Sequence, residues 1–368
     1  MQSNNKKKIC IVASSLGKGG AEKSSALLSI LLNKEGYDVH IVSVLNIIDY
    51  AYAGKLYNLG SMKELNGTLL GRIKKLMLFK KYLRRHDFDC IIDNRSRVQA
   101  YREFIITKFI YNVPTIYVVH NYKTSHAFTK YNWLSGYLYK NEFMTAVSME
   151  ARDKFKKKFG LNNIHTIYNT FDSEDILKQS KANNEAALAA GKYILFFGRI
   201  DDRHKNLKLL ISSFKESMLP ELQYKLLLLG DGKDLNEMKK HVREQNLEEH
   251  VVFKGFVANP FPFIKHARYT VLTSRNEGFP MVIAESLCVG TPVVSVDCKS
   301  GPKEIIINKK NGLLIENHNE LALVNALNEL ITNEELYRYC KQNAKQSIDK
   351  FSMEAIAKDW VALIEKVK

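Results

Sequence analysis

Two glutamates beside a glycine-rich turn carry the strongest chemical signal in this chain of 368 residues. Glu277 and Glu285 lie in the segment 277–298, which reads EGFPMVIAESLCVGTPVVSVDC. Carboxylates accept hydrogen bonds from neighbouring hydroxyl groups, and Gly278 lets the backbone approach a ligand closely. The pattern therefore predicts a site for a ligand with several hydroxyls. The alternative is a pair of solvated glutamates on a surface helix.

The sequence around this segment predicts a strand, a loop, a helix and a second strand in succession. Residues 269–274 are rich in β-formers, the apolar spacing after Pro280 favours a helix, and residues 293–296 are typical of a buried strand. Glu277 then lies in the loop and Glu285 about one turn into the helix, so that both can reach one elongated ligand. The free amides and the positive dipole end of such a helix suit an anionic group.

The segment resembles the signature of the retaining glycosyltransferases of family 4, whose GT-B fold binds a nucleotide sugar between two Rossmann-like domains. This resemblance implies that Glu277 binds hydroxyls of the donor sugar and that Glu285 binds the ribose of the nucleotide. The backbone amides of the intervening turn would contact the sugar and the phosphates. That turn consists of Gly278, Phe279, Pro280 and Met281.

A second element that resembles the family follows a strongly apolar run in the second half of the chain. It contains Arg199 and Lys205, and the resemblance implies that both bind the diphosphate of the donor. Two fixed cations stabilise the negative charge that develops on a departing nucleoside diphosphate without a metal ion. The gap between them is one residue longer than in the commonest form of the family. It holds Asp201 and Asp202, for which metal binding is the alternative interpretation.

Two features of the first half resemble the same family. Gly19 and Gly20 lie in a glycine-rich loop before a predicted helix. There they would bring the helix start close to the donor phosphates or the acceptor, and a plain tight turn is the alternative. His120 follows the predicted strand 115–119, at the carboxyl edge where α/β sheets bind their ligands. The resemblance implies that His120 contacts the donor sugar near the reacting carbon, and a purely structural histidine is the alternative.

Three further polar residues of the first half are candidates for binding an anionic acceptor. Asn94 and Arg95 follow another predicted strand, 89–93, and Lys123 lies shortly after His120. Cationic side chains bind anionic oxygens through charge-assisted hydrogen bonds. We therefore expect Asn94 and Arg95 at a similar edge of the sheet.

The net charge of +16 belongs almost wholly to the first half of the chain. Residues 1–170 hold 27 Lys and Arg against 12 Asp and Glu, whereas the remaining residues are nearly balanced. Such a basic half predicts an anionic partner surface. Because no RNA- or DNA-binding motif accompanies the charge, we expect a membrane surface and no nucleic acid.

Residues 68–86 have the pattern of a basic amphipathic helix. One interpretation is a helix that lies at an anionic lipid interface, and the other is a core-packed helix with a solvated basic face. No apolar stretch in the sequence approaches the ~18 residues that a membrane-spanning helix requires. The apolar side of the predicted helix holds Leu69, Leu70, Ile73, Leu76, Met77 and Leu83.

The alternation of strands with helices predicts an α/β protein, and the length suits two domains. The resemblance implies a GT-B fold, in which two Rossmann-like parallel-sheet domains face each other across a cleft. Five cysteines without close pairing indicate a reducing cytosol. The predicted parts are an N-terminal acceptor domain 1–172, a linker 173–190, a nucleotide-sugar domain 191–350 and a C-terminal helix 351–368 that packs on the N-terminal domain.

The resemblance implies a retaining, metal-independent glycosyltransferase that uses no cofactor. We expect it to move a hexose or an N-acetylhexosamine from a nucleotide sugar, with a UDP-sugar favoured, to a lipid-linked or polysaccharide acceptor. Its setting would be bacterial surface-glycan synthesis, such as lipopolysaccharide or capsule, on the cytoplasmic face of the membrane. The alternatives are a nucleotide-sugar epimerase of the same fold and a non-catalytic sugar-nucleotide binding partner. A nicotinamide oxidoreductase is disfavoured because no dinucleotide fingerprint follows the first strand.

Overall fold

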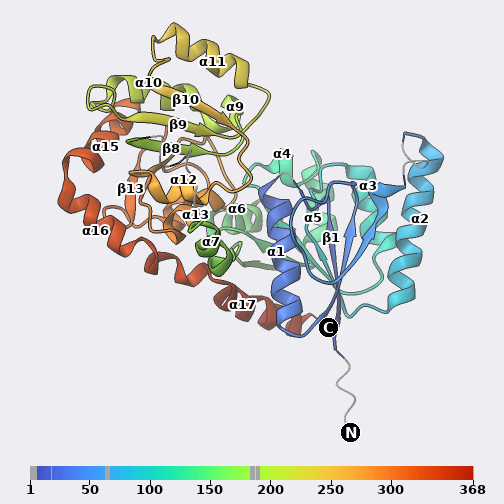
Figure 1. Ribbon diagram of the computed structural model, residues 1–368. Helices are drawn as coiled ribbons and strands as arrows, with labels where there is room; N and C mark the ends of the chain where they lie inside the picture. The colour runs from blue at the N-terminus through green and yellow to red at the C-terminus, as the bar shows by residue number, and fades with distance from the viewer. Residues whose placement is uncertain (1–5, 18, 63–66, 183–186, 188–190, 368) are drawn as a thin grey trace. The chain divides into compact units, whose positions relative to one another are not determined.

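The computed structural model divides the chain into two compact units, each with its own sheet (Figure 1). One unit consists of Met1–Thr170 with Met353–Lys368, and the other of Phe171–Ser352. Both sheets are entirely parallel, so the predicted α/β class is confirmed. The structure describes residues 6–17, 19–62, 67–182, 187 and 191–367.

The sheet of the first unit has seven strands in the order β3-β2-β1-β4-β5-β6-β7. Its central strands are almost wholly buried, as expected of strands that helices cover on both faces. The strand order reverses between β1 and β4, and such a reversal is where open α/β sheets bind ligands at the carboxyl ends of their strands. The strands are β1 (Lys8–Ala13), β2 (Asp38–Ser43), β3 (Lys55–Asn58), β4 (Cys90–Asp93), β5 (Thr115–Val119), β6 (Phe143–Ala146) and β7 (Asn163–Thr166).

Successive side chains of each strand project to opposite faces of this sheet, so both faces carry buried side chains and both are covered by helices. Cys10 and Val12 of β1 share a core cluster with Phe79 of α2. Leu28 of α1 and Trp360 of α17 line a small cavity on the opposite face, where α1 and α17 contact each other. The helices of this unit are α1 (Gly20–Lys34), η1 (Leu59–Ser61), α2 (Leu69–His86), α3 (Ala100–Ile105), the π-helix η3 (Ile106–Ile110), α4 (Thr124–Ala127), α5 (Asn132–Tyr139), α6 (Met149–Phe159) and α17 (Met353–Lys366).

The sheet of the second unit has six strands in the order β10-β9-β8-β11-β12-β13. Its strands are β8 (Tyr193–Phe197), β9 (Lys225–Leu229), β10 (Val251–Gly255), β11 (Thr270–Leu272), β12 (Val293–Val296) and β13 (Gly312–Ile315). Its helices are α7 (Ser173–Gln179), α9 (Asp202–Lys205), α10 (Leu207–Glu216), α11 (Leu235–Glu244), α12 (Phe261–His266), α13 (Met281–Cys288), α14 (Pro302–Ile305), α15 (Glu320–Thr332), α16 (Glu334–Ala344) and η4 (Gln346–Phe351).

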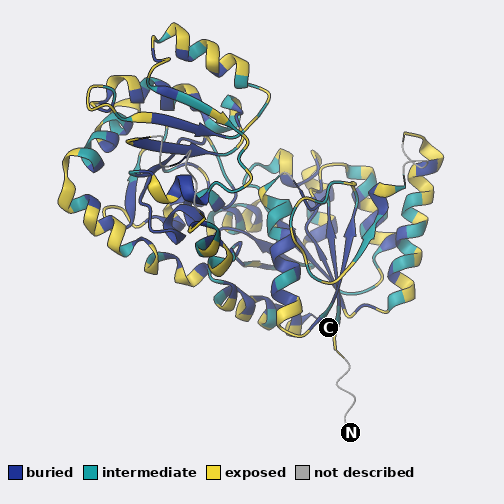
Figure 2. Ribbon diagram, in the orientation of Figure 1, coloured by how far each residue is buried: buried dark blue, intermediate teal, exposed yellow. Residues whose placement is uncertain are grey.

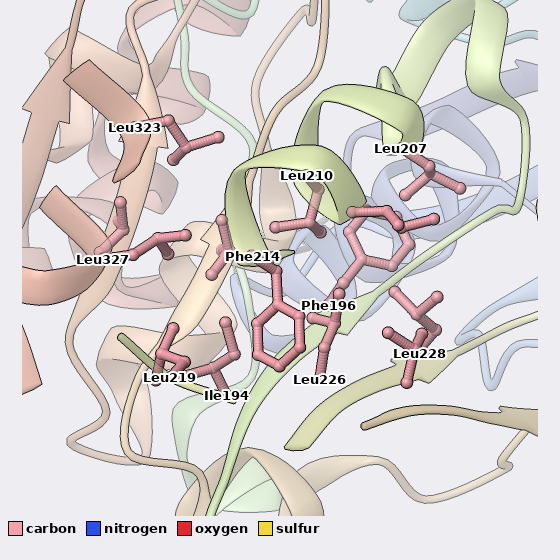
Figure 3. Close-up of a cluster of buried hydrophobic side chains, with 14 of the residues drawn as sticks. Ile194, Phe196, Leu207, Leu210, Phe214, Leu219, Leu226, Leu228, Leu323 and Leu327 are labelled. Atoms are coloured by element: carbon pink, nitrogen blue, oxygen red, sulfur yellow. The ribbon is translucent and has the colours of Figure 1, made fainter. Parts of the chain in front are cut away.

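A dense apolar core lies under one face of the second sheet (Figure 3). Phe196 of β8 and Phe214 of α10 are fully buried there, next to Leu327 of α15. Figure 2 shows the same division along the helices, with buried inner faces and exposed outer faces. This packing fixes the strand ends from which the loops of the candidate site emerge.

Two segments differ from their predicted description. Residues 173–190 were expected as a linker, but the segment begins with α7, which packs on α12 and α13 and thus belongs to the second unit. Asn259 donates a side-chain hydrogen bond of 3.0 Å to the carbonyl of Gln179 at the end of α7. Residues 351 and 352 close the second unit, and the C-terminal helix α17 belongs to the first.

The predicted amphipathic helix over residues 68–86 is α2 (Leu69–His86), and only part of its apolar side packs in the core. Phe79 and Leu83 are buried in the core, whereas Leu69, Leu70 and Met77 are exposed. The predicted apolar side is therefore divided along its length, with an exposed start and a core-packed end. In the described part of the chain, no helix is long and apolar enough to span a membrane.

Candidate active-site residues

The carboxyl ends of β1, β4 and β5 surround an open hollow in the first unit. Its wall contains Asn94, Arg95 and His120, together with Glu22 from the first turn of α1. Parallel strands end at the same edge of a sheet, which is why residues from separate predicted strands meet there. The start of α1 has no side-chain cap among the described residues, so its first amides lack an intrahelical partner.

His120 and Asn94 form a partly buried polar pair in the wall of this hollow. The Nε2 atom of His120 lies 3.1 Å from Oδ1 of Asn94, and we assign the proton to Nε2 because the amide oxygen can only accept. Nδ1 of His120 and Nδ2 of Asn94 are buried and have no hydrogen-bond partner among the described residues. An unpaired buried polar atom costs about 1–3 kcal/mol, and this pair leaves one acceptor and one donor unsatisfied beside the hollow.

The charge state of His120 follows from its surroundings. Burial, together with the nearby positive charge of Arg97, lowers the pKa of His120 to about 3. The imidazole is therefore neutral at physiological pH. It can orient a hydroxyl group through hydrogen bonds, but it does not supply a positive charge.

Arg95 is engaged in an internal ion-pair network. Its guanidinium lies 2.7 Å from Asp93 and 3.3 Å from Glu103, and all three side chains are buried. Burial opposes ionisation of Asp93, but the charges of Arg95 and Arg97 outweigh it and lower the pKa of Asp93. Two carboxylates within the protein thus neutralise the charge of Arg95. This pairing weighs against its predicted role in binding an anionic acceptor.

Arg97 also lines the hollow and was missed by the sequence analysis. This buried guanidinium donates to the carbonyls of Val118 at 2.6 Å and Arg95 at 2.9 Å, and its Nε has no partner among the described residues. The ring of Phe128 lies 5.6 Å from it. Nothing in the sequence distinguishes Arg97 from a solvated arginine, because the carbonyl of Val118 and the rings that surround its guanidinium come from parts of the chain more than 15 residues away.

The two predicted glycines lie next to Ala21 and Glu22, which line the hollow. A Cβ atom at Gly19 would collide with the carboxylate of Glu22, whereas a Cβ at Gly20 would meet no atom within 4 Å. A side chain at Gly19 would therefore displace the end of the Glu22 side chain. Lys123 precedes α4, and its amide donates a hydrogen bond of 2.8 Å to the side-chain oxygen of Asn121. Lys123 does not line the hollow.

In the second unit, two predicted donor-binding residues meet in an ion pair. The ammonium of Lys205 lies 2.6 Å from a carboxylate oxygen of Glu277, and both side chains are mostly shielded from solvent. Lys205 ends α9 after β8, and Glu277 lies in the loop after β11. The hydroxyl of Thr273 supports this contact by donating a hydrogen bond of 2.8 Å to the carbonyl of Lys205. Arg199, at the same edge after β8, is exposed.

The turn after Glu277 is held by a loop that the sequence analysis did not assign. The Glu277 amide donates to the carbonyl of Lys299 at 2.8 Å, and the hydroxyl of Ser300 donates to the carbonyl of Gly278 at 3.2 Å. The α13 helix then begins at Met281, after Phe279 and Pro280, as the sequence predicts. Glu285 lies in this helix and is buried. The loop after β12 thus positions the predicted sugar- and phosphate-binding turn.

Asp201 and Asp202 have structural partners within the second unit. Asp201 lies 2.9 Å from Nδ1 of His204, and the Asp202 side chain accepts from the amide of Lys208 at the start of α10. Burial opposes ionisation of Asp201, but the hydrogen bonds and charges of His204 and Lys233 together outweigh it and lower the pKa of Asp201. The longer gap between Arg199 and Lys205 is accommodated by the short helix α9.

Family models and relatives match both halves of the chain. The model for Glycosyl transferases group 1 matches residues 178–347, and the model for Glycosyltransferase Family 4 matches residues 18–175. A Campylobacter jejuni protein named "N-acetylgalactosamine-N,N'-diacetylbacillosaminyl-diphospho-undecaprenol 4-alpha-N-acetylgalactosaminyltransferase" is 29% identical over 96% of this chain and 98% of its own length. The amylovoran biosynthesis glycosyltransferase AmsD of Erwinia amylovora is 25% identical over 93% of this chain and 95% of its own.

Solved structures share the fold over nearly the whole chain. The Anabaena protein HepE in complex with UDP-glucose has a TM-score of 0.76 at 19% identity, covering 98% of this chain and 99% of its own. Sucrose-phosphate synthase from Thermosynechococcus elongatus has a TM-score of 0.79 at 17% identity, with 98% and 99% coverage. Since the two family models together span most of its length, the chain belongs to the family 4 glycosyltransferases and is a glycosyltransferase of the GT-B fold.

Proposed function

We propose that the protein transfers a hexose or an N-acetylhexosamine from a UDP-sugar to a lipid-linked acceptor with retention of configuration. The observation that carries this proposal is the Lys205–Glu277 ion pair, which sets a cation and a hydroxyl acceptor side by side at the carboxyl edge of the second sheet. The acceptor class is supported by relatives, because the Campylobacter jejuni relative is named for a diphospho-undecaprenol acceptor. The donor class is supported by the shared fold of HepE, which was solved with UDP-glucose.

The second unit supplies the groups that a departing nucleoside diphosphate requires. Lys205 and the exposed Arg199 are cations at the end of β8, where the diphosphate would lie next to the start of α13. Glu277 would bind sugar hydroxyls while it remains paired with Lys205, and Glu285 would bind the ribose. Because fixed cations and helix amides stabilise the leaving charge, we propose that the reaction requires neither a metal ion nor a cofactor.

The bond changes balance without a separate catalytic base. The bond between the anomeric carbon and the phosphate oxygen breaks, and its electron pair stays on the diphosphate. The acceptor hydroxyl attacks from the same face, and its proton passes to the departing phosphate oxygen. The charge that develops on the sugar is oxocarbenium-like, as in other glycosyl transfers.

The first unit would orient the reacting sugar and the acceptor. His120 is neutral and, with Asn94, leaves one buried acceptor and one buried donor without a partner among the described residues, beside the hollow. These are the groups that a sugar hydroxyl satisfies at once, since it both donates and accepts. With the basic surface of this unit, we propose that the enzyme works as a peripheral protein on the cytoplasmic face of a membrane in surface-glycan synthesis.

The direct test is nucleotide release from a panel of UDP-, GDP- and ADP-sugars, with and without polyprenyl-diphosphate-linked glycan acceptors, in the presence of EDTA. We expect UDP release that depends on the acceptor and persists with EDTA. Turnover of the donor without an acceptor would favour an epimerase. Donor binding without any release would favour a non-catalytic partner and contradict the proposal.

A further inference from the structure

Several large apolar side chains of the first unit are exposed although they lie on helices that pack on its sheet. Tyr101 at the start of α3 is 81% exposed, and Trp133 at the start of α5 is 71% exposed. Isolated exposed apolar residues are ordinary, but a contiguous group marks an interaction surface. The group, which we term the aromatic rim, consists of Leu69, Leu70, Tyr101, Phe109, Trp133 and Tyr137.

The three segments that carry the rim lie side by side on one face of the sheet. Phe79 of α2 and Ile106 of η3 belong to one core cluster, which also contains side chains of β1 and β4. The α2 helix also contacts η3. Lys108 of η3 lies 5.1 Å from the ring centroid of Tyr137 in α5. The rim therefore continues across neighbouring helices of one layer.

Four of the six rim residues lie at helix starts, at the edge of the sheet that holds the His120–Asn94 hollow, whereas Phe109 lies near the end of η3. Helices that connect parallel strands start at the edge where the preceding strand ends. Leu69, Tyr101 and Trp133 lie within the first two residues of α2, α3 and α5. The hollow lies at the carboxyl ends of β4 and β5, which precede α3 and α5.

The charge around the rim is almost entirely positive. Residues 69–86, 100–110 and 130–140 contain eleven Lys and Arg and a single acidic residue, Glu103. Glu103 is buried and accepts from Arg95, so it presents no carboxylate to a partner. The exposed charge at the rim is therefore basic and complements an anionic surface.

We propose that the aromatic rim inserts into the interface of an anionic lipid bilayer and brings the His120–Asn94 hollow to the level of the head groups. Trp and Tyr prefer the boundary between head groups and acyl chains, and basic residues beside them bind anionic lipids. A second copy of the chain fits less well, because two such basic surfaces repel each other and protein interfaces are poor in lysine. The inference rests on the proposed function, since it lets the diphosphate of a lipid-linked acceptor reach the hollow without leaving the membrane.

The placement of the two tryptophans permits a direct test. Trp133 is in the rim, whereas Trp360 is buried in α17, so the variant Trp360→Phe reports on Trp133 alone. Its fluorescence is measured with vesicles of phosphatidylcholine, with or without phosphatidylglycerol, that carry brominated acyl chains. We expect a blue shift and quenching only with the anionic vesicles. Unchanged emission with anionic vesicles would overturn the inference.

A matched pair of variants separates the rim from general surface effects. Tyr101→Ser with Trp133→Ser should weaken flotation with anionic vesicles about tenfold or more, because two interfacial aromatic residues are lost. Leu321→Ser with Tyr339→Ser changes two exposed apolar residues of the second unit and should leave flotation unchanged. Equal flotation of the two variants would overturn the inference, as would a dimer of the wild-type chain that the rim variant abolishes.

Activity on two acceptors keeps this inference distinct from the proposed function. With a short-chain, water-soluble diphosphate-linked acceptor, the rim variant should turn over like the wild type. With a long-chain acceptor in vesicles, it should lose activity in parallel with binding. If the wild type binds vesicles but uses neither acceptor, the proposed function is wrong, whereas the inference that the rim binds the membrane still holds. If the wild type and the rim variant use the vesicle-borne acceptor equally, the inference about the rim is wrong, whereas the proposed function still holds.

Discussion

Replacing Lys205 with alanine should reduce activity far more than stability. The ammonium lies 2.6 Å from Glu277, with 19% and 16% of the two side chains exposed. A hydrogen bond between charged groups contributes about 1.5–3 kcal/mol when buried, so this partly exposed pair contributes about 1–2 kcal/mol to the free energy of unfolding. If Lys205 stabilises the leaving diphosphate, its loss should lower kcat by about 10²–10³-fold, or about 2.7–4 kcal/mol.

Nucleotide release at saturating donor measures kcat, and urea unfolding measures stability. Lys208→Ala is the matched control, because Lys208 forms an ion pair with Glu237 at 2.7 Å but both side chains are about half exposed. This control should change neither quantity measurably. A folded Lys205→Ala enzyme whose kcat stays within a few-fold of the wild type would refute the assignment of Lys205 to the leaving group.

Three further predictions follow from the first unit. The pKa of His120 falls to about 3 in the folded protein, so between about pH 3 and 6.5 the unfolded chain binds a proton at His120 that the folded protein does not. The free energy of unfolding should therefore decrease as the pH is lowered from about 6.5 towards 3. His120→Asn should lessen this pH dependence in urea titrations. Arg95→Met should destabilise the protein by about 3–5 kcal/mol in the same assay, because it leaves buried carboxylates unpaired; a change below 1 kcal/mol would argue against the network. Gly19→Ala should lower kcat/KM for the donor, since its Cβ displaces Glu22, while Gly20→Ala, which meets open space, should not; equal effects would contradict the steric argument.

The order of strands and helices could be predicted where the local pattern is strong. The strand Val293–Val296 and the helix start at Met281 were predicted from apolar spacing, from Pro280 and from the break at Gly290, and both agree with the structure. His120 and Asn94 were expected at strand ends, and their meeting follows from the parallel sheet. Periodicity and turn residues are local properties, and for this reason the sequence reveals them.

The partners of charged side chains could not be predicted in the same way. Arg95 and Arg97 are two positions apart, yet one is paired with carboxylates and the other donates to carbonyls. Both outcomes depend on tertiary neighbours in β5, α3 and α4, which local spacing does not specify. The turn from Glu277 is likewise held by Ser300, from a loop 23 residues later in the chain. For the same reason α7 looked like a linker, since its contacts are with α12 and α13.

The configuration of the product distinguishes retaining transfer to a lipid-linked acceptor from the other reactions of a sugar nucleotide. The enzyme would be incubated with an α-linked UDP-sugar and a polyprenyl-diphosphate-linked glycan, and the product analysed by mass spectrometry and by the anomeric proton coupling in its NMR spectrum. We expect an acceptor extended by one sugar in α linkage. A β-linked product, or free sugar with an unchanged acceptor, would contradict it.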